Sequence, residues 1–228
     1  AARGQGVSPV TRARARPARR AAVEKKRGRY HHGDLRRALL DAALEVLSAE
    51  GASALTLREV ARRAGVTHAA PYRHFADKQA LLTAVAEEGF RMLTAEMLER
   101  SVPVKDDPVR ALQAIGVGYV RFATTQRAHF QVMFGKDIGW AREPCELEET
   151  ADRCFGVLIS AVQACQAVGA VRPGDPLIPA LGAWSMVHGL SEFIANGQFS
   201  AMELSVPPVE QLVAIFTTML IEGARAKE

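Results

Sequence analysis

Residues 55–82 of this chain read LTLREVARRAGVTHAAPYRHFADKQALL, and this stretch decides the fold. Thr56 can cap a short helix, with Glu59 three residues later as its capping-box partner. Gly65 can adopt the left-handed conformation that ends such a helix. Thr67 can then cap a second short helix. Two short helices around a glycine-containing turn predict a helix-turn-helix.

Pro71 lies inside the second short helix, which we expect to run from Thr67 to about Phe75. Proline has no backbone N–H, and it disfavours helical geometry at the preceding residue, here Ala70. Because Pro71 comes only four residues after Thr67, little hydrogen bonding is lost. We therefore expect a shortened or tilted second helix.

Elsewhere, apolar residues recur at three- and four-residue spacing, which is typical of amphipathic helices, and no convincing run of alternating strand residues is present. The chain has 228 residues, of which 48% are hydrophobic, and this is ample for a packed core. We predict an all-α fold of about nine helices. Besides the two short helices, the predicted helices are residues 34–50, 78–100, 108–122, 127–134, 144–168, 177–196 and 209–225.

The formal net charge of +4 is distributed unevenly along the chain. Residues 1–30 hold ten Lys or Arg against one acid, Glu24, which gives +9. Residues 31–80 carry +1, and residues 81–228 carry −6. We interpret residues 1–29 as a disordered basic arm that meets an anionic polymer, because Lys and Arg release the counterions of nucleic-acid phosphates.

Neither a targeting signal nor a membrane helix explains the sequence well. The pair Arg19-Arg20 resembles a twin-arginine signal superficially, but no apolar segment follows it. Residues 154–171 and 176–191 are uncharged and approach the length of a membrane helix, about 17–25 residues. They also contain polar groups, such as Gln163. We predict buried helices of a cytoplasmic chain that does not contact a membrane.

Enzymatic and metal-binding patterns are missing from the sequence. Cys145, Cys154 and Cys165 form no CxxC pair and have no histidine at short ligand spacing, so we expect reduced core residues and no metal site. No GxSxG elbow, metal triad or phosphate loop occurs. We therefore predict no catalytic residue and no cofactor, although an enzyme remains the first rival function.

At this point the motifs resemble those of the tetracycline-repressor-like (TetR) family of one-component bacterial regulators. Gly65, the run from Tyr72 to Phe75 (YRHF) and the run from Lys78 to Leu82 (KQALL) fall at the family's spacing. Residues 30–36 (YHHGDLR) look like the opening of one subgroup, and the motif Trp184-x-x-x-His188-Gly189 is similar to that subgroup's C-terminal signature.

The resemblance implies a basic arm (1–29), a helix-turn-helix DNA-binding domain (30–79) and a ligand-binding and dimerisation domain (80–228). The last two helices are apolar on more than one face, which favours a homodimer in which they form a four-helix bundle. Such a dimer places two recognition helices about 34–36 Å apart on palindromic, double-stranded DNA. The resemblance also implies a small-molecule effector.

Nine residues are candidates for DNA contacts, although Pro71 stands where the family more usually has an aliphatic residue. Thr56 and Thr67 are helix caps first, and His74 has the alternative of packing beside Phe75. Alanine methyl groups can meet thymine methyls. The candidates on the recognition helix, which faces the bases, are Thr67, His68, Ala69, Ala70 and Arg73. Thr56 is a candidate for a phosphate contact because it starts a helix, and the resemblance implies phosphate contacts for Tyr72, His74 and Lys78.

Candidates for effector binding are aromatic, methionine and polar residues of the acidic C-terminal part. Most aromatic residues there have the alternative of being ordinary core, and Trp184 and His188, four apart on one helix face, can equally form a structural pair. The candidates are Tyr119, Phe122, His129, Phe130, Met133, Phe155, Gln163, Trp184 and His188.

These observations predict a ligand-responsive transcriptional regulator, in the first instance a repressor that its effector releases from a palindromic operator. The alternative is a DNA-binding regulator without a small-molecule effector. An empty, collapsed ligand domain would favour that alternative.

Overall fold

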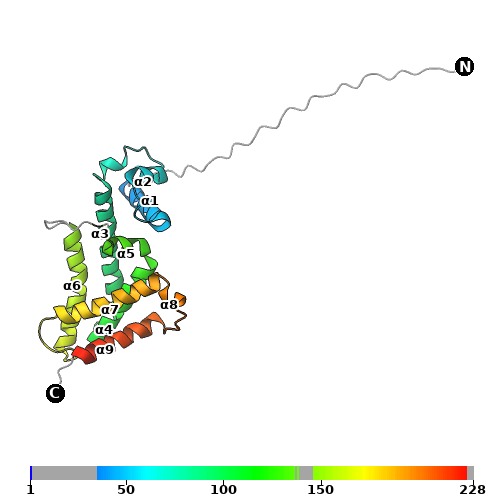
Figure 1. Ribbon diagram of the computed structural model, residues 1–228. Helices are drawn as coiled ribbons and strands as arrows, with labels where there is room; N and C mark the ends of the chain where they lie inside the picture. Colours follow the sequence, from blue (N-terminus) through cyan, green and yellow to red (C-terminus); the bar gives the residue numbers. More distant parts are fainter. Residues whose placement is uncertain (2–34, 137, 139–145, 225–228) are drawn as a thin grey trace. The chain divides into compact units, whose positions relative to one another are not determined.

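The computed structural model describes Ala1 and residues 35–136, 138 and 146–224, and all of these except Ala1 belong to one unit, Asp34–Glu228. Within these ranges the chain forms nine α-helices, two 3-10 helices and no strand, which confirms the predicted all-α fold (Figure 1). The predicted basic arm lies outside the described residues.

The helices agree with the predicted ones to within a few residues, with two exceptions. The short helix α8 lies in a segment that we expected to be irregular, and the second helix of the helix-turn-helix is replaced by a 3-10 turn. The α-helices are α1 (Leu35–Glu50), α2 (Leu57–Ala64), α3 (Lys78–Ser101), α4 (Pro108–Thr125), α5 (Arg127–Phe134), α6 (Glu146–Ala167), α7 (Leu177–Ala195), α8 (Gln198–Ala201) and α9 (Val209–Ala224), and the 3-10 helices are η1 (Pro71–Arg73) and η2 (Val102–Val104).

Both ends of α2 are formed as the sequence predicts. Thr56 Oγ1 accepts a hydrogen bond from the Glu59 N–H at 3.1 Å. Gly65 has φ 70°, a left-handed conformation that a side chain would strain. The Val66 N–H then reaches back to the Ala61 carbonyl at 3.0 Å, which completes a Schellman motif. These caps fix the length of α2 and the direction in which the chain leaves it.

The prediction that the second helix of the motif is an α-helix is wrong. Residues 68–70 form a turn, and only Pro71–Arg73 is helical, in the 3-10 form. In an α-helix that began at Thr67, residue 71 would donate its N–H to the Thr67 carbonyl. Pro71 has no N–H, and the Ala70 N–H takes this carbonyl instead, at 3.0 Å. The predicted shortening is therefore confirmed.

Two details of that prediction are corrected. The residue before η1 is Ala70, which has φ −62° and ψ −43°, so the following proline has not pushed it out of helical geometry. The N-terminus of η1 has no side-chain cap, so the Thr67 hydroxyl does not act as one. The turn closes at its other end, where the His74 and Phe75 N–H groups both donate to the Pro71 carbonyl at 2.9 Å.

Helix α3 connects the helix-turn-helix with the C-terminal helices. It begins where Asp77 Oδ1 accepts from the Ala80 N–H at 2.8 Å, as predicted, and it runs unbroken for 24 residues. Leu81 and Leu82 near its start are buried in the same core as α1, and Leu93 further along joins the core around α4 and α6. The predicted domain boundary between residues 79 and 80 falls inside this helix and stays a prediction.

The C-terminal helices pack around α4. Asp107 caps α4 by accepting from the Arg110 N–H at 3.1 Å, and Pro108 is its first residue, as predicted. Helices α7 and α9 lie side by side, and both contact α4 (Figure 1). Cys154 and Cys165 are free and buried, as expected, whereas Cys145 lies outside the described residues. No helix in the described ranges is long and apolar enough to span a membrane.

Two helical glycines provide a matched test of this packing. A Cβ atom at Gly116 of α4 would lie 2.7 Å from Val213 Cγ1 of α9, whereas a Cβ at Gly156 of α6 would meet nothing within 4 Å. We expect Gly116→Ala to lower the free energy of unfolding by about 1–3 kcal/mol, because the β-branched Val213 must shift. We expect Gly156→Ala to raise it by about 0.5–1 kcal/mol through helix propensity. Urea denaturation at one protein concentration measures both, and equal effects would contradict the packing of α4 against α9.

Candidate DNA-binding surface and ligand cavity

The turn between α2 and α3 presents most of the residues predicted to contact DNA. Thr67, His68, Ala69, Arg73 and His74 are exposed. The same is true of Tyr72, whose exposed fraction of 55% is unusual for a large side chain. Ala70 is half-buried, and therefore offers the least of its surface. This surface is what a chain segment that reads DNA would need to present.

Two buried residues hold this turn in place. Pro71 is buried, and Phe75 is 3% exposed and belongs to the main core, as predicted for an anchor. The Arg36 guanidinium carbon of α1 lies 5.6 Å from the centre of the Phe75 ring, within range of a cation–π interaction. His74 packs beside Phe75 with 6.5 Å between ring centres, yet it stays exposed. His74 therefore packs on the anchor residue and is also accessible from outside the chain.

Ion pairs use two of the three arginines of α2. The Glu59 carboxylate accepts from Arg62 at 2.5 and 2.8 Å and from Arg63 Nε at 3.3 Å, and Arg63 also pairs with Glu50 of α1. The pKa of Glu59 is lowered to about 2, and the hydrogen bond from Arg62 contributes most to this shift. The Glu59 carboxylate therefore forms ion pairs with arginines of its own helix. These ion pairs take the place of the expected capping-box contact back to residue 56. Arg58 is exposed and has no ion pair with any residue in the described ranges.

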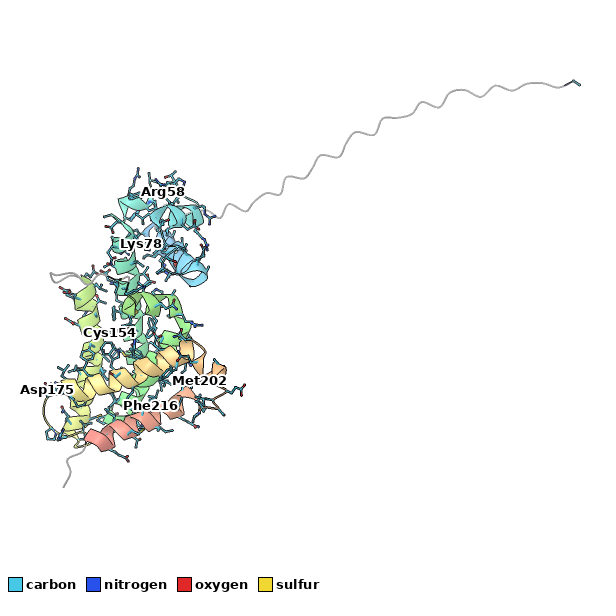
Figure 2. The ribbon with its side chains drawn as sticks, in the orientation of Figure 1. Arg58, Lys78, Cys154, Asp175, Met202 and Phe216 are labelled. Carbon is cyan, nitrogen blue, oxygen red and sulfur yellow. The ribbon has the colours of Figure 1, made fainter. Side chains whose placement is uncertain are left out.

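Lys78 joins the start of α3 to the loop that precedes α2. Its Nζ donates to the Ala52 carbonyl at 2.6 Å. An ammonium group has three N–H donors, so this contact leaves donors for a phosphate. Thr56 is exposed at the start of α2, as a phosphate-binding helix terminus requires. Figure 2 shows Arg58 and Lys78 in the part of the molecule that α1, α2 and the start of α3 form.

A cavity of about 320 Å³ lies among helices α3 to α7 and α9, within the usual size range of small-molecule sites. Three of the nine residues predicted to bind an effector line it, namely Tyr119, Phe155 and Trp184. Its wall is almost entirely apolar and aromatic. The lining also includes Phe90, Phe134, Asp152, Cys154, Phe216 and Thr217, which were not among the nine candidates.

A hydrogen-bonded chain of three side chains includes two residues of this wall, Tyr119 and Trp184, and one residue outside it, His188. Trp184 Nε1 of α7 donates to Tyr119 Oη of α4 at 3.1 Å, and Tyr119 Oη lies 2.8 Å from His188 Nδ1. Burial lowers the pKa of His188, against the opposing effect of the Glu192 carboxylate. Burial raises the pKa of Tyr119, so the phenol keeps its proton, and it donates to His188 Nδ1 when the imidazole carries its own proton on Nε2.

The remaining candidates for effector binding lie outside the cavity lining. His188 and Phe130 stand behind it, where their ring centres are 5.3 Å apart. Phe122 and Met133 are buried core residues. Gln163 is exposed on the outer surface of α6. Amphipathic spacing predicts that such residues face inward, but which of them meet a void depends on how the helices cross.

His129 is the last of the nine candidates and lies at a different place, between α5, α3 and α1. Its ring is buried, and Nε2 lies 3.7 Å from Glu88 Oε1 without a hydrogen bond. Arg37 of α1 donates to Glu88 at 2.6 Å and to Asp41 at 2.5 Å. Burial lowers the pKa of His129, and Glu88 opposes this effect. These contacts tie α1 to the helices that surround the cavity.

A second hollow adjoins His129, but its lining is that of a surface groove. It measures about 570 Å³ and lies between α1 and the junction of α4 with α5. Ser48, Thr125 and Arg127 line it and are exposed. A small-molecule site normally encloses most of its ligand within apolar walls. The cavity beside Trp184 meets this requirement better, and we treat it as the candidate ligand site.

Comparisons with known proteins agree with this division into a DNA-facing part and a cavity-bearing part. The family model for bacterial regulatory proteins of the tetR family matches residues 39–85. The family model for the tetracyclin repressor-like C-terminal domain matches residues 112–220. The first range contains the helix-turn-helix and its turn, and the second contains Tyr119, Phe155 and Trp184.

Individual relatives support the same assignment. The class A tetracycline repressor protein from transposon 1721 of Escherichia coli is 42% identical over 73 residues, which cover 32% of each chain. The HTH-type transcriptional regulator AcrR of Shigella flexneri is 31% identical over 106 residues, which cover 45% of this chain and 49% of AcrR. The chain thus spans about half the length of these relatives or less. A solved structure of a Rhodococcus sp. RHA1 protein of unknown function is 34% identical, with a TM-score of 0.73, and the match covers 87% of this chain and all of that one.

Two histidines, the buried His129 and the half-buried His188, predict how stability depends on pH. The pKa values of His129 and His188 in the folded chain lie below the ordinary value of about 6.5. Between the folded and the ordinary value the unfolded chain binds a proton that the folded chain does not. Stability therefore falls as the pH falls below about 6.5. We expect a lower melting temperature at pH 5.5 than at pH 7.5.

The variant His188→Asn isolates one of these groups, because its amide oxygen can accept from Tyr119 without titrating. We expect its loss of stability between pH 7.5 and pH 5.5 to be smaller than that of the parent chain. His74→Asn, at an exposed histidine, is the matched control. The raised pKa of buried Glu87 has the opposite effect, so the difference between variants is the quantity to measure. An unchanged pH dependence in His188→Asn would contradict the lowered pKa of the half-buried His188.

Proposed function

We infer the function from the premise that this chain belongs to the tetracycline-repressor-like (TetR) family of helix-turn-helix transcriptional regulators. Its relatives in this family are DNA-binding regulators, and repression is their general mode of action. We propose that this chain is a homodimeric repressor and that a small molecule in the cavity beside Trp184 releases it from a palindromic operator. The observation that carries the proposal is one helix, α3, that borders both the DNA-facing turn and the cavity.

In this proposal the exposed turn after α2 reads the bases. His68 and Arg73 present hydrogen-bonding groups, and the Ala69 methyl can meet a thymine methyl. The exposed Thr56 and Tyr72 and the remaining donors of Lys78 meet the phosphates on either side. Because η1 is a single 3-10 turn, few side chains can reach base edges. We therefore expect much of the affinity to come from phosphate contacts, to which the basic arm would add.

The dimer in this proposal forms through α7 and α9, whose outer faces are unusually apolar. Ile178 is 69% exposed, Met219 57%, and Ile215 and Phe193 48% each. Monomeric soluble proteins rarely expose apolar residues in such number on two adjacent helices. A two-fold axis would bring each face onto the same face of a second copy. The inner faces of α7 and α9 line the cavity, so an occupant bears on both helices of the interface.

A route from the cavity to the DNA-facing turn runs through α5 and α3. Phe134 at the end of α5 lines the cavity, and His129 on the same helix lies against Glu88 of α3, which holds Arg37 of α1. We propose that an occupant displaces α5 and α3 and thereby changes how α1 is held. Release requires that the effector bind the DNA-free state more tightly than the DNA-bound state. The cavity supports this proposal over a regulator without an effector.

The variant Arg73→Ala tests the DNA-binding part of the proposal. Genomic fragments selected by the purified chain provide the probe, and fluorescence anisotropy at fixed salt gives the dissociation constants. We expect Arg73→Ala to weaken binding to the selected site by about 1–3 kcal/mol and to reduce the preference over unrelated DNA. Arg153→Ala, at an exposed arginine of α6, is the control and should bind like the parent chain. Equal binding by both variants would refute the assignment of the turn.

The variant Met219→Glu tests the dimer. We expect it to shift the chain from dimer to monomer at micromolar concentration, because two carboxylates would face each other in an apolar interface. Leu98→Glu replaces an apolar residue of α3 that is 42% exposed, and it should remain dimeric. Sedimentation equilibrium measures the difference. A parent chain that is already monomeric would overturn the proposed interface, and a dimeric Met219→Glu would move it elsewhere.

A further inference from the structure

The hydrogen-bonding character of the cavity wall restricts the chemistry of what it can bind. Among the described residues, no Lys, Arg or His lines the cavity, and only five lining side chains are polar. These are Tyr119, Asp152, Cys154, Trp184 and Thr217. All other lining residues are apolar or glycine, with Phe90, Phe134, Phe155 and Phe216 contributing aromatic rings.

The donors of these polar side chains are already used within the protein. Trp184 Nε1 donates to Tyr119 Oη, and the Tyr119 hydroxyl lies 2.8 Å from His188 Nδ1, to which it donates when the imidazole carries its proton on Nε2. The Thr217 hydroxyl donates to the Val213 carbonyl of its own helix at 2.8 Å. Burial raises the pKa of the Cys154 thiol to about 11, so the thiol keeps its proton, but a thiol is only a weak donor. The side chains of the wall therefore leave no strong donor for a ligand.

Backbone donors are equally unavailable. An α-helix leaves only its first four N–H groups without an intrahelical partner. The first lining residues of α4, α7 and α9 are Leu112, Leu181 and Val213, and each is the fifth residue of its helix. The lining residues of α3, α5 and α6 lie deeper in theirs. No helix N-terminus therefore points free N–H groups into the cavity.

Acceptors remain available. Tyr119 Oη and Thr217 Oγ1 each keep a lone pair, because an oxygen of this type accepts as well as donates. Asp152 is exposed on α6 at the edge of the cavity and forms no ion pair within the described residues. An ionised carboxylate or phosphate in this cavity would lose its water and gain no donor, which is strongly unfavourable. A hydroxyl or an ammonium group would meet acceptors, and an ammonium group would also meet the Asp152 charge and aromatic faces.

We propose that the cavity takes an apolar molecule without an anionic group, whose polar end donates hydrogen bonds as a hydroxyl or an ammonium group. The inference rests on the proposed function, in which this cavity holds the effector. It goes further because it excludes long-chain acids and other anionic amphiphiles as effectors of this chain. Cys154 on α6 and Phe216 on α9, both labelled in Figure 2, are among the residues that line this cavity.

The test compares three probes with the same ten-carbon chain: 1-decanol, decylammonium and decanoate, each below its micelle concentration at pH 7.5. Binding is followed by the emission of Trp184 in the variant Trp140→Phe and by the shift in melting temperature. We expect decanol and decylammonium to bind and decanoate to bind at least about tenfold more weakly, which corresponds to the loss of one well-made polar contact. Measuring binding directly keeps this result separate from DNA release.

Two variants locate the bound probe. Asp152→Asn should weaken the binding of decylammonium and leave the binding of decanol unchanged. Asp106→Asn, at an exposed carboxylate outside the cavity, should change the binding of neither probe. Ala183→Phe fills part of the cavity and should abolish binding of both probes; if it fails to fold, Ala151→Leu replaces it. Unchanged decanol binding by the folded cavity-filling variant would overturn the proposed location.

The outcomes separate the inference from the function on which it rests. Decanoate binding as tightly as the other two probes would overturn the ligand class, while the cavity would remain a binding site. Binding of none of the three would overturn both the ligand class and the use of the cavity by an effector. Binding of decanol and decylammonium with release of operator DNA would support both.

Discussion

The hydrogen bond from the Ala80 N–H to the Asp77 carboxylate starts the helix on which both functional parts depend. Because α3 is a single unbroken helix from that point to Ser101, its first turns complete the helix-turn-helix, and its later turns form one wall of the cavity. Leu82 and Leu93 belong to the same buried cluster. In the proposed function, a displacement of α3 at the cavity would therefore reach the turn between α2 and α3 through one continuous helix and not through a flexible linker.

The chemistry at the two ends of α3 differs in kind. At the end near the turn, Arg73, Tyr72 and His68 are exposed while the buried Pro71 and Phe75 hold the turn, so these side chains are available to partners outside the chain. At the cavity end, Trp184 donates its N–H to the Tyr119 hydroxyl, and this hydroxyl is hydrogen-bonded to His188. The exposed polar side chains at the first end suit an anionic polymer as a partner. The polar groups at the cavity end are already hydrogen-bonded within the protein, which suits an apolar small molecule.

Most of the fold could be predicted from the sequence because its signals are local. The caps at Thr56, Asp77 and Asp107 and the left-handed Gly65 each act within a few residues, and the structure forms all four. The turn around Pro71 was predicted less well, since Pro71 has no N–H to donate to the Thr67 carbonyl and the Ala70 N–H closes a turn onto it instead, which residue preferences do not resolve. Helix α8 was missed because four residues are too short to show a periodic pattern.

The cavity could be predicted only in part, for a physical reason that its residues illustrate. Tyr119 and Phe130 are both large, aromatic and buried, and sequence spacing places both on inward faces, yet only Tyr119 meets the void. Which of two such residues borders a void is decided by the crossing of helices far apart in sequence, such as α4 with α9 at Gly116. The same crossing brings α7 and α9 against the cavity on one face and leaves their other face apolar and exposed. Since both faces belong to the same two helices, in the proposed dimer a molecule that fits the cavity better at one spacing of α7 and α9 would favour that spacing, and by reciprocity a dimer held on DNA at another spacing would bind the molecule more weakly.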